Sequence, residues 1–241
     1  MTVGVVVRGV VTVACAVVLV AGCSAQADPP AAPTEDPAAV AMRAVEKLVL
    51  PDQVTSSAGL TPVGGPEVGV QPLVSCPDPA AVPELAAATP AIAGRTQRWQ
   101  WTAPDGTTVP YSLYSAVYDG IPAREAIKQA RAVTKCYPNQ QDPVPWLDRQ
   151  VYRTDGLPST KPFVDDRFAY CVRRGAIDYT ETVDEHLASR VEVVWDCAAF
   201  MAEGQKLVRL NSVQHNRKAS PLNAPTVDTV GQAMVDALVA P

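Results

Sequence analysis

Residues 190–201 read RVEVVWDCAAFM, and beyond a Glu-Gly pair the chain continues as KLVRLNSV over residues 206–213. In the first stretch the side chains at every second position from Val191 to Cys197 are apolar or sulfur-containing, and Glu192 is one of the acidic residues between them. This period of two is typical of a β-strand with one buried face. The Glu-Gly pair between two such runs predicts a turn, so the two stretches are expected to form a hairpin.

Working outward from this hairpin, other stretches have the composition of strands. Asp105-Gly106 separates two runs rich in aromatic and β-branched residues, which is a strong signal for a second hairpin. Pro110 lies in the second of these runs and limits that end to a sheet edge or a bulge. The two runs of this hairpin are residues 98–103 and 107–118. Further strands are expected over residues 149–153 and 167–174.

Helical signals lie on both sides of these strands. Asp36-Pro37 predicts an N-cap followed by proline in the first turn, and the apolar period then continues to Pro51. Residues 52–75 are expected to form a loop that holds one short helical turn. Other helices are expected over residues 77–88, from Pro122 to about Lys135 with its apolar face toward the core, and after a cap at Thr226. Hairpins mixed with peripheral helices predict an α+β fold with a largely antiparallel sheet flanked by helices.

The N-terminal 22 residues have the pattern of a signal peptide, with Arg8 in the positive region and an unbroken apolar and small-residue run over residues 9–22. Val20-Ala21-Gly22-Cys23 resembles the bacterial lipobox, in which the cysteine receives a diacylglycerol. We therefore expect a signal peptide over 1–22, a lipidated Cys23 with a Pro/Ala-rich tether over 23–37, and one extracytoplasmic domain over 38–241. An ordinary secretory signal and an uncleaved anchor are the alternatives.

Composition excludes several classes of protein. The formal net charge of −5 gives no basic footprint for nucleic-acid binding, and two histidines do not support a histidine-rich metal site. Arginine outnumbers lysine, and alanine, valine and proline are abundant, which is typical of a GC-rich genome such as that of an actinobacterium. The sequence lacks the common motifs of serine nucleophiles, zinc proteases, phosphate-binding loops and dinucleotide-binding folds. We therefore expect that the protein is not an enzyme and that it has no catalytic residues, no metal and no cofactor.

Four cysteines remain in the mature chain: Cys76, Cys136, Cys171 and Cys197. An even number in an exported protein indicates disulfides, and three connectivities exist. We favour Cys76–Cys136 with Cys171–Cys197, because the second pair can lie on neighbouring strands. A zinc site is disfavoured, because no two cysteines are separated by two residues.

Two groups of side chains are candidates for binding. Aromatic residues concentrate on the 98–118 hairpin and could stack against a sugar or lipid, or else pack in the core: Trp99, Trp101, Tyr111, Tyr114 and Tyr118. A basic stripe on the helix after Pro122 could contact an anionic phospholipid or polymer, or else be an ordinary solvated face: Arg124, Lys128, Arg131 and Lys135.

The order of these features resembles the extracellular sensor domain of mycobacterial PknH-type receptor kinases and their free lipoprotein relatives. The residues that carry the resemblance are 48–52, Cys76, 126–136, Tyr170-Cys171 and 191–197. The resemblance implies two disulfides and a sheet that lines a cleft for an unknown ligand. The chain departs from the pattern by an acidic insert over 175–189 and by a longer tail after Cys197, and it carries no kinase motif.

Together these observations predict a membrane-anchored extracytoplasmic lipoprotein with a non-enzymatic, sensor-like domain that binds an envelope ligand or a protein partner. The membrane is engaged through Cys23, and nucleic acid is not a partner. A structural or secretion-accessory lipoprotein and an envelope enzyme are the alternatives. A cleft with convergent titratable groups favours the enzyme, a dry apolar groove favours ligand binding, and a flat apolar patch favours assembly with a partner.

Overall fold

The computed structural model divides the chain after Thr34 and places Glu35–Pro241 in one compact unit. The structure describes residues 35–136, 150–153, 164–178, 182–183, 186–187, 190–216 and 227–240. The signal peptide, Cys23, most of the tether and the Thr226 cap of the sequence analysis lie outside these residues. The described part carries its own buried core and both disulfides, as expected of a domain that folds independently.

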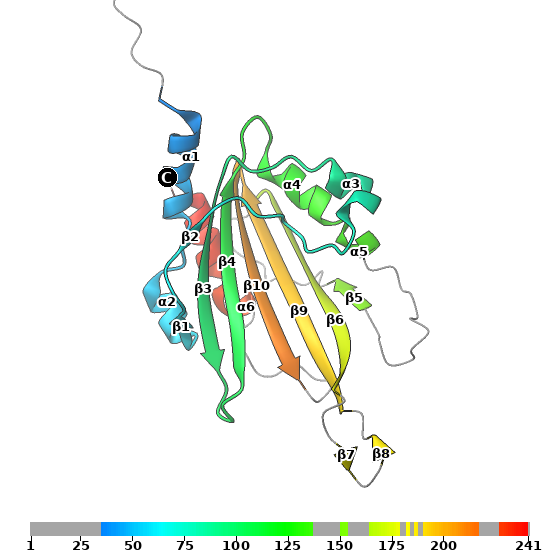
Figure 1. Ribbon diagram of the computed structural model, residues 1–241. Coiled ribbons are helices and arrows are strands. Elements are labelled where there is room, and N and C mark those ends of the chain that lie inside the picture. Colours follow the sequence, from blue (N-terminus) through cyan, green and yellow to red (C-terminus); the bar gives the residue numbers. More distant parts are fainter. Residues whose placement is uncertain are drawn as a thin grey trace, which may run out of the picture. The chain divides into compact units, whose positions relative to one another are not determined.

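Strands of the domain form one eight-stranded sheet and a separate two-stranded one (Figure 1). The main sheet has the order β1-β3-β4-β10-β9-β6-β5, with β2 also paired to β3, and every pairing in it is antiparallel. The α+β class with a largely antiparallel sheet is therefore confirmed. The strands are β1 (Leu60–Pro62), β2 (Glu67–Val68), β3 (Ala93–Thr102), β4 (Thr108–Val117), β5 (Gln150–Arg153), β6 (Asp166–Asp178), β7 (Thr182–Val183), β8 (His186–Leu187), β9 (Arg190–Glu203) and β10 (Lys206–Asn216).

Both predicted hairpins are present. The β9–β10 hairpin turns at Gly204, whose φ of 56° suits glycine, and lies at the centre of the sheet. The β3–β4 hairpin turns at 104–106, where Gly106 has a φ of 84°. Pro110 lies in the part of β4 that pairs with β3 but not with β10, as its missing N–H group requires. The two edge strands β1 and β2 were not predicted, since residues 52–75 were expected to be loop around one helical turn.

Helices lie on both faces of the sheet. They are α1 (Pro37–Lys47), α2 (Asp52–Ser57), a 3-10 turn η1 (Pro79–Ala81), α3 (Pro83–Ala86), α4 (Ala123–Ala130), α5 (Val133–Cys136) and α6 (Val227–Val239). The Asp36 carboxylate caps α1 by accepting a hydrogen bond from the Ala38 N–H (3.0 Å), as predicted. Pro37 is in the first turn of α1, as the sequence predicts.

The single helix predicted from Pro122 to Lys135 is wrong in its second half. Helix α4 ends at Ala130, and the chain tightens there, because the Ala132 N–H donates to the Gln129 carbonyl oxygen (2.9 Å). This tighter turn lets both Ala132 and Val133 face the core, and the chain resumes as the short helix α5.

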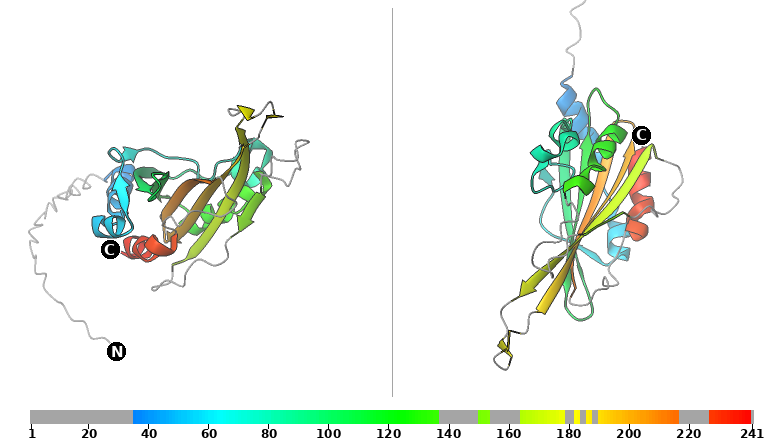
Figure 2. Two further views of the ribbon diagram at one scale, coloured as in Figure 1. Left: turned by 90° about the horizontal axis from the view of Figure 1, so that it is seen from below. Right: turned by 90° about the vertical axis from the view of Figure 1, so that its right-hand side faces the viewer.

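Two apolar layers pack on opposite faces of the sheet, because successive side chains of a strand point to opposite sides. Figure 2 shows the helices that lie on these two faces. On one face, α4 covers Tyr114, Phe168 and Phe200. On the other face, α6 and the residues that flank α2 cover Trp99, Met201 and Val208. Helix α1 packs beside this second layer, on β3 and β4.

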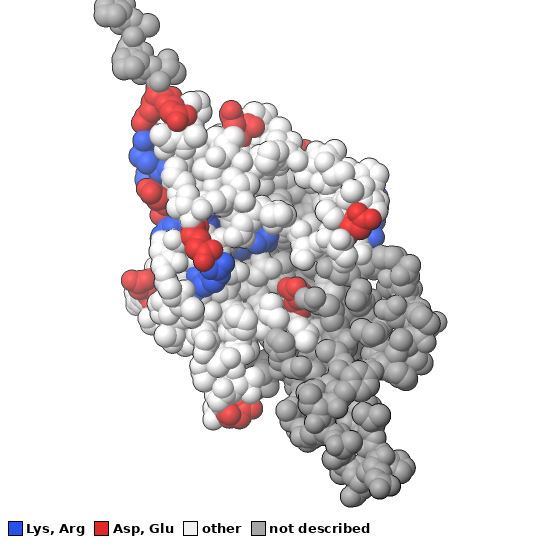
Figure 3. Space-filling model, viewed as in Figure 1, with Lys and Arg blue, Asp and Glu red and all other residues white. Residues whose placement is uncertain are grey.

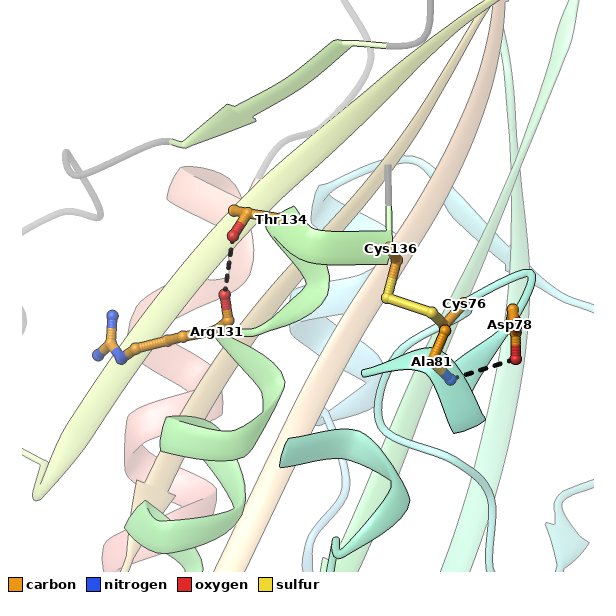
Figure 4. The surroundings of a disulfide bond; sticks show 6 residues. All are labelled: Cys76, Asp78, Ala81, Arg131, Thr134 and Cys136. Atoms are coloured by element: carbon orange, nitrogen blue, oxygen red, sulfur yellow. Dashed lines mark hydrogen bonds between the residues drawn. A yellow bond between two sulfur atoms is a disulfide. The ribbon is translucent and has the colours of Figure 1, made fainter. Parts of the chain in front are cut away.

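Both disulfides follow the favoured connectivity. Cys171 and Cys197 lie directly opposite each other on β6 and β9, with their Cα atoms 4.0 Å apart. Cys76 is bonded to Cys136 at the end of α5, which joins that helix to the segment before η1 (Figure 4). Disulfides persist in oxidising compartments, so they indicate an extracytoplasmic location for the domain.

Candidate ligand-binding site

The five aromatic residues of the candidate platform do not form one surface. Tyr111 belongs to the layer beneath α6, whereas Tyr114 and Tyr118 belong to the layer beneath α4. The reason is their spacing: residues three apart on a strand point to opposite faces. Trp99 and the three tyrosines are at most 5% exposed, and only Trp101 is half-buried. The rings therefore pack in the core, and a shared solvent-facing platform is excluded by this geometry.

Burial also affects the protonation state of these tyrosines. Loss of hydration raises the pKa of Tyr111, Tyr114 and Tyr118 above the ordinary range of a phenol. The phenols are therefore uncharged at physiological pH.

The candidate basic stripe is also divided. Arg124 and Lys128 lie on α4, Arg131 follows that helix, and Lys135 lies on α5. Three of the four cations have acidic partners: Lys128 pairs with Glu125 (3.4 Å), Arg131 with Asp166 (2.7 Å) and Lys135 with Glu84. Arg131 also lies over the Phe168 ring, 5.0 Å from its centroid. The pair of Lys128 lies within α4, whereas Arg131 and Lys135 tie the end of α4 and α5 to β6 and α3, and an additional contact with an anionic surface stays a prediction.

The long connection that joins β2 to β3 crosses the face of the sheet that carries α4 (Figure 1). We call residues 70–91 the strap; they include η1 and α3. Near its start, Gly69 and Gly94 approach closely, since the Gly69 N–H donates to the Gly94 carbonyl oxygen (2.9 Å). A Cβ atom on Gly94 would lie 2.6 Å from the Gly69 oxygen, so this approach requires glycine.

A buried arginine holds the first part of the strap against the sheet. Arg209 on β10 donates from Nη1 to the carbonyl oxygens of Pro72 (2.6 Å) and Leu73 (2.8 Å), and from Nη2 to Gln71 Oε1 (3.3 Å). The guanidinium also lies over the Tyr114 ring, 5.1 Å from its centroid. In addition, the Gln71 N–H donates to Tyr114 Oη (3.1 Å). Desolvation lowers the pKa of Arg209, and its hydrogen bonds go to uncharged partners.

Between the strap and α4 lies a pocket of about 350 Å³, which we call the strap pocket. It is lined by strap residues 70–74, 79, 85 and 88–91, by Tyr118 just after β4, and by Ala126, Gln129 and Ala130 of α4. All of these described lining residues are apolar or uncharged. Figure 3 views the molecule from the side of α3 and α4, where large areas carry neither acidic nor basic side chains.

Gln129 is the notable polar residue of the lining. Its Oε1 atom is buried and has no hydrogen-bond partner, although other atoms of the side chain are partly exposed. The described residues contain three further unpaired buried amide oxygens, those of Gln97, Asn211 and Gln214, and Gln129 is the one of the four that belongs to the pocket lining. An unpaired buried amide oxygen is energetically unfavourable. The strap pocket therefore combines an apolar wall with one unsatisfied polar group.

A second hollow, which we call the α1 groove, has a volume of about 710 Å³. It is lined by residues of α1, by the β9–β10 turn and by the end of α6. Three exposed aliphatic side chains lie along it, namely Val40, Ile92 and Val239. Tyr118 contributes to the lining of both the strap pocket and the α1 groove.

The described part of the chain was found to contain neither a candidate metal-ion cluster nor a helix that could cross a membrane. No three or more histidine, cysteine, aspartate and glutamate residues of that part gather in a way that could hold a metal ion. Within the same residues, no helix has both the length and the hydrophobicity to cross a bilayer.

Comparison with known proteins gives one structural neighbour to report. No protein-family model matches the chain, and no curated protein matches it. Among solved structures, the chain is similar to the extracellular domain of PknH from Mycobacterium tuberculosis. The two share 12% sequence identity with a TM-score of 0.41, over 82% of this chain and 94% of that domain. PknH is also the protein after which the domain type in the sequence resemblance is named.

Proposed function

We propose that this chain is a membrane-anchored extracytoplasmic protein that binds a small apolar ligand of the cell envelope in the strap pocket, without catalysing a reaction. The observation that carries the proposal is the apolar pocket itself. A sealed cavity of about 150 Å³ is enough to hold benzene, and ligand pockets begin at about 300 Å³. At about 350 Å³, the strap pocket has room for a ligand larger than one aromatic ring.

The anchoring half of the proposal is supported by the sequence. Val20-Ala21-Gly22-Cys23 ends an apolar run of signal-peptide length. Two acyl chains on Cys23 would supply the pair of hydrophobic anchors needed for stable membrane attachment. The Pro/Ala-rich segment after Cys23 would then let the domain stand up to about 40 Å from the bilayer.

A non-enzymatic role is supported by the chemistry of the pocket wall. The described lining residues include no acid, base, histidine, cysteine or serine, and their side-chain hydroxyls are those of Thr89 and Tyr118. Burial keeps Tyr118 protonated, which removes the only phenol of the lining as a base at neutral pH. An apolar hollow without convergent titratable groups is the feature that separates a binding protein from an enzyme among the alternatives considered above.

Native mass spectrometry tests this proposal directly. The mature protein would be purified from its own envelope and examined for a co-purified small molecule. Ala88→Trp should abolish that species, because Ala88 is an exposed residue of the pocket lining and an indole there would fill the space. Ala81→Trp is the matched control, since Ala81 is equally exposed on η1 but lies outside the lining.

The same spectra report on the anchor. An N-terminal mass that includes diacylglycerol on Cys23 supports the lipoprotein assignment, and an unmodified cysteine contradicts it. A bound species that persists in Ala88→Trp would show that the ligand lies elsewhere. A wild-type protein that carries no small molecule and binds none on addition of an apolar probe would refute the binding role.

A further inference from the structure

We infer that the ligand of the strap pocket is uncharged, and that its one polar group forms a hydrogen bond with the side-chain amide of Gln129. This inference rests on the proposed function and specifies its ligand class: a neutral molecule with an apolar body of about two fused rings, or a branched chain of similar bulk, that bears one hydroxyl or amide. Anionic lipids and free carboxylates are excluded from the site.

Charge is the first part of the argument. The polar side chains in the described lining are Gln71, Thr89, Tyr118 and Gln129, none of which is ionised at neutral pH. An anionic ligand would lose its hydration on entry and find no cation in the wall, which is strongly unfavourable. Arg209 lies near but outside the lining, and its Nη atoms already donate to the strap at Gln71, Pro72 and Leu73.

The partner for the polar group follows by comparing these side chains. The Gln71 amide oxygen accepts from Arg209, and its backbone N–H donates to Tyr114, so its bonding is largely used. Thr89 is exposed and therefore already hydrated. Of the four side chains, Tyr118 included, Gln129 is the one with a buried polar atom that has no partner, namely Oε1.

A hydrogen bond to this oxygen is the polar contact that adds most to the binding affinity of a ligand. The terminal torsion of glutamine is broad, so the amide can turn with little strain toward the pocket, whose lining includes Gln129. A ligand hydroxyl placed there pairs an atom that the unliganded protein leaves unsatisfied. A ligand without a donor leaves the Gln129 oxygen as it is, so it binds through apolar contact alone.

Three probes test separately whether the pocket excludes charge and whether it pairs with a hydroxyl. They are 1-naphthol, naphthalene and 1-naphthoate, which share a ring system and differ in one substituent. They would be titrated by calorimetry into the Glu35–Pro241 unit at neutral pH. We expect 1-naphthol to bind roughly three- to tenfold more tightly than naphthalene, which is the range for one net hydrogen bond. The 1-naphthoate anion should bind more weakly than naphthalene, despite its larger surface.

Gln129→Leu isolates the hydrogen bond. Leucine has a similar size and a high helix propensity, so α4 should persist. In this variant 1-naphthol should fall to the affinity of naphthalene, while naphthalene itself should bind within about twofold of its wild-type affinity, because apolar contact depends on area. The naphthalene titration thus shows that the variant is folded and its pocket intact.

The outcomes distinguish the two levels of inference. If 1-naphthoate binds as tightly as 1-naphthol, the exclusion of charge is overturned. If 1-naphthol keeps its advantage over naphthalene in Gln129→Leu, the assignment to Gln129 is overturned. If no probe binds the wild-type unit, the strap pocket is not a ligand site, and the proposed function itself fails.

Discussion

The contact between the strap and β3 depends on the absence of a single side chain. Gly94 lies beneath Gly69, and a Cβ atom on it would lie 2.6 Å from the Gly69 carbonyl oxygen and 2.7 Å from Tyr114 Oη. The oxygen belongs to the backbone, so it cannot turn aside as a flexible side chain would. Any larger residue must push the strap away from the sheet.

Gly94→Ala should therefore lower the free energy of unfolding by about 1–3 kcal/mol, the range for an overpacked site. Urea denaturation measures the loss. Gly65→Ala is the matched control, because its Cβ atom would meet nothing within 4 Å and its φ is not positive. This control should be neutral or slightly stabilising, since alanine restricts the unfolded chain. Equal stability of the two variants would contradict the close approach.

Alkaline pH should destabilise the protein through its buried phenols. Burial raises the pKa of Tyr111, Tyr114 and Tyr118 in the folded state above the value of about 10 that applies to the unfolded chain. Their contribution to stability is complete below pH ~10 and declines as the pH rises from there toward the folded-state values, because only the unfolded state releases these protons.

An ultraviolet titration of phenolate absorbance tests this. Of the seven tyrosines in the sequence, at least these three should fail to titrate near pH 10 while the fold persists. They should ionise together with unfolding, and in concentrated urea all seven should titrate as free phenols do. A single transition for all seven in the folded protein would mean that these rings are solvated.

At the scale of elements, the two disulfides have different positions relative to the strap pocket. Cys76 lies two residues beyond the lining residue Val74, and its bond to Cys136 anchors the strap to α5. Cys171–Cys197 joins β6 to β9, and neither cysteine contributes to the pocket lining. Stability should depend on both bonds, whereas ligand binding should depend on the first.

Replacing each pair by serine separates these roles. Both Cys76→Ser with Cys136→Ser and Cys171→Ser with Cys197→Ser should lower the free energy of unfolding by about 2–4 kcal/mol. Titration with 1-naphthol should show weaker binding in the first variant and unchanged binding in the second. If the two variants bind the probe equally well, the strap keeps its position without the Cys76–Cys136 bond.

The sequence predicts elements well where local periodicity is strong. The two hairpins, the cap at Asp36 and the apolar face of α4 follow from spacing and turn chemistry alone. The split of Tyr111 from Tyr114 also follows from spacing, because residues three apart on a strand cannot share a face. The end of α4 does not, since the tighter turn that buries both Ala132 and Val133 leaves no mark in the apolar period.

The candidate pocket could not be predicted in the same way. Arg209 stands in a strand among apolar residues, and its partners are the carbonyl oxygens of Pro72 and Leu73, more than 130 residues away along the chain. Every residue type carries such an oxygen, so no pattern in the sequence marks it. The buried amide of Gln129 is likewise recognisable only once the strap covers α4.

For the whole molecule, attachment to the membrane is expected to depend on one cysteine. Cys23→Ala should move the protein from the membrane to the soluble fraction or stall its processing. The reason is that Cys23 carries the one thiol of the lipobox to which the lipid can be attached. Fractionation followed by immunoblotting measures both effects. Cys15→Ala is the control, since Cys15 lies within the predicted signal peptide and should change neither processing nor location.

Retention and normal processing of Cys23→Ala would contradict the lipoprotein assignment. The fold and the strap pocket would be unaffected by that result, because the compact unit begins at Glu35.

Tyr118 borders two hollows of different size. It contributes to the lining of the strap pocket, of about 350 Å³, and to that of the α1 groove, of about 710 Å³. A substitution at this one position therefore alters the wall of both hollows at once, including the groove along which Val40 and Val239 are exposed.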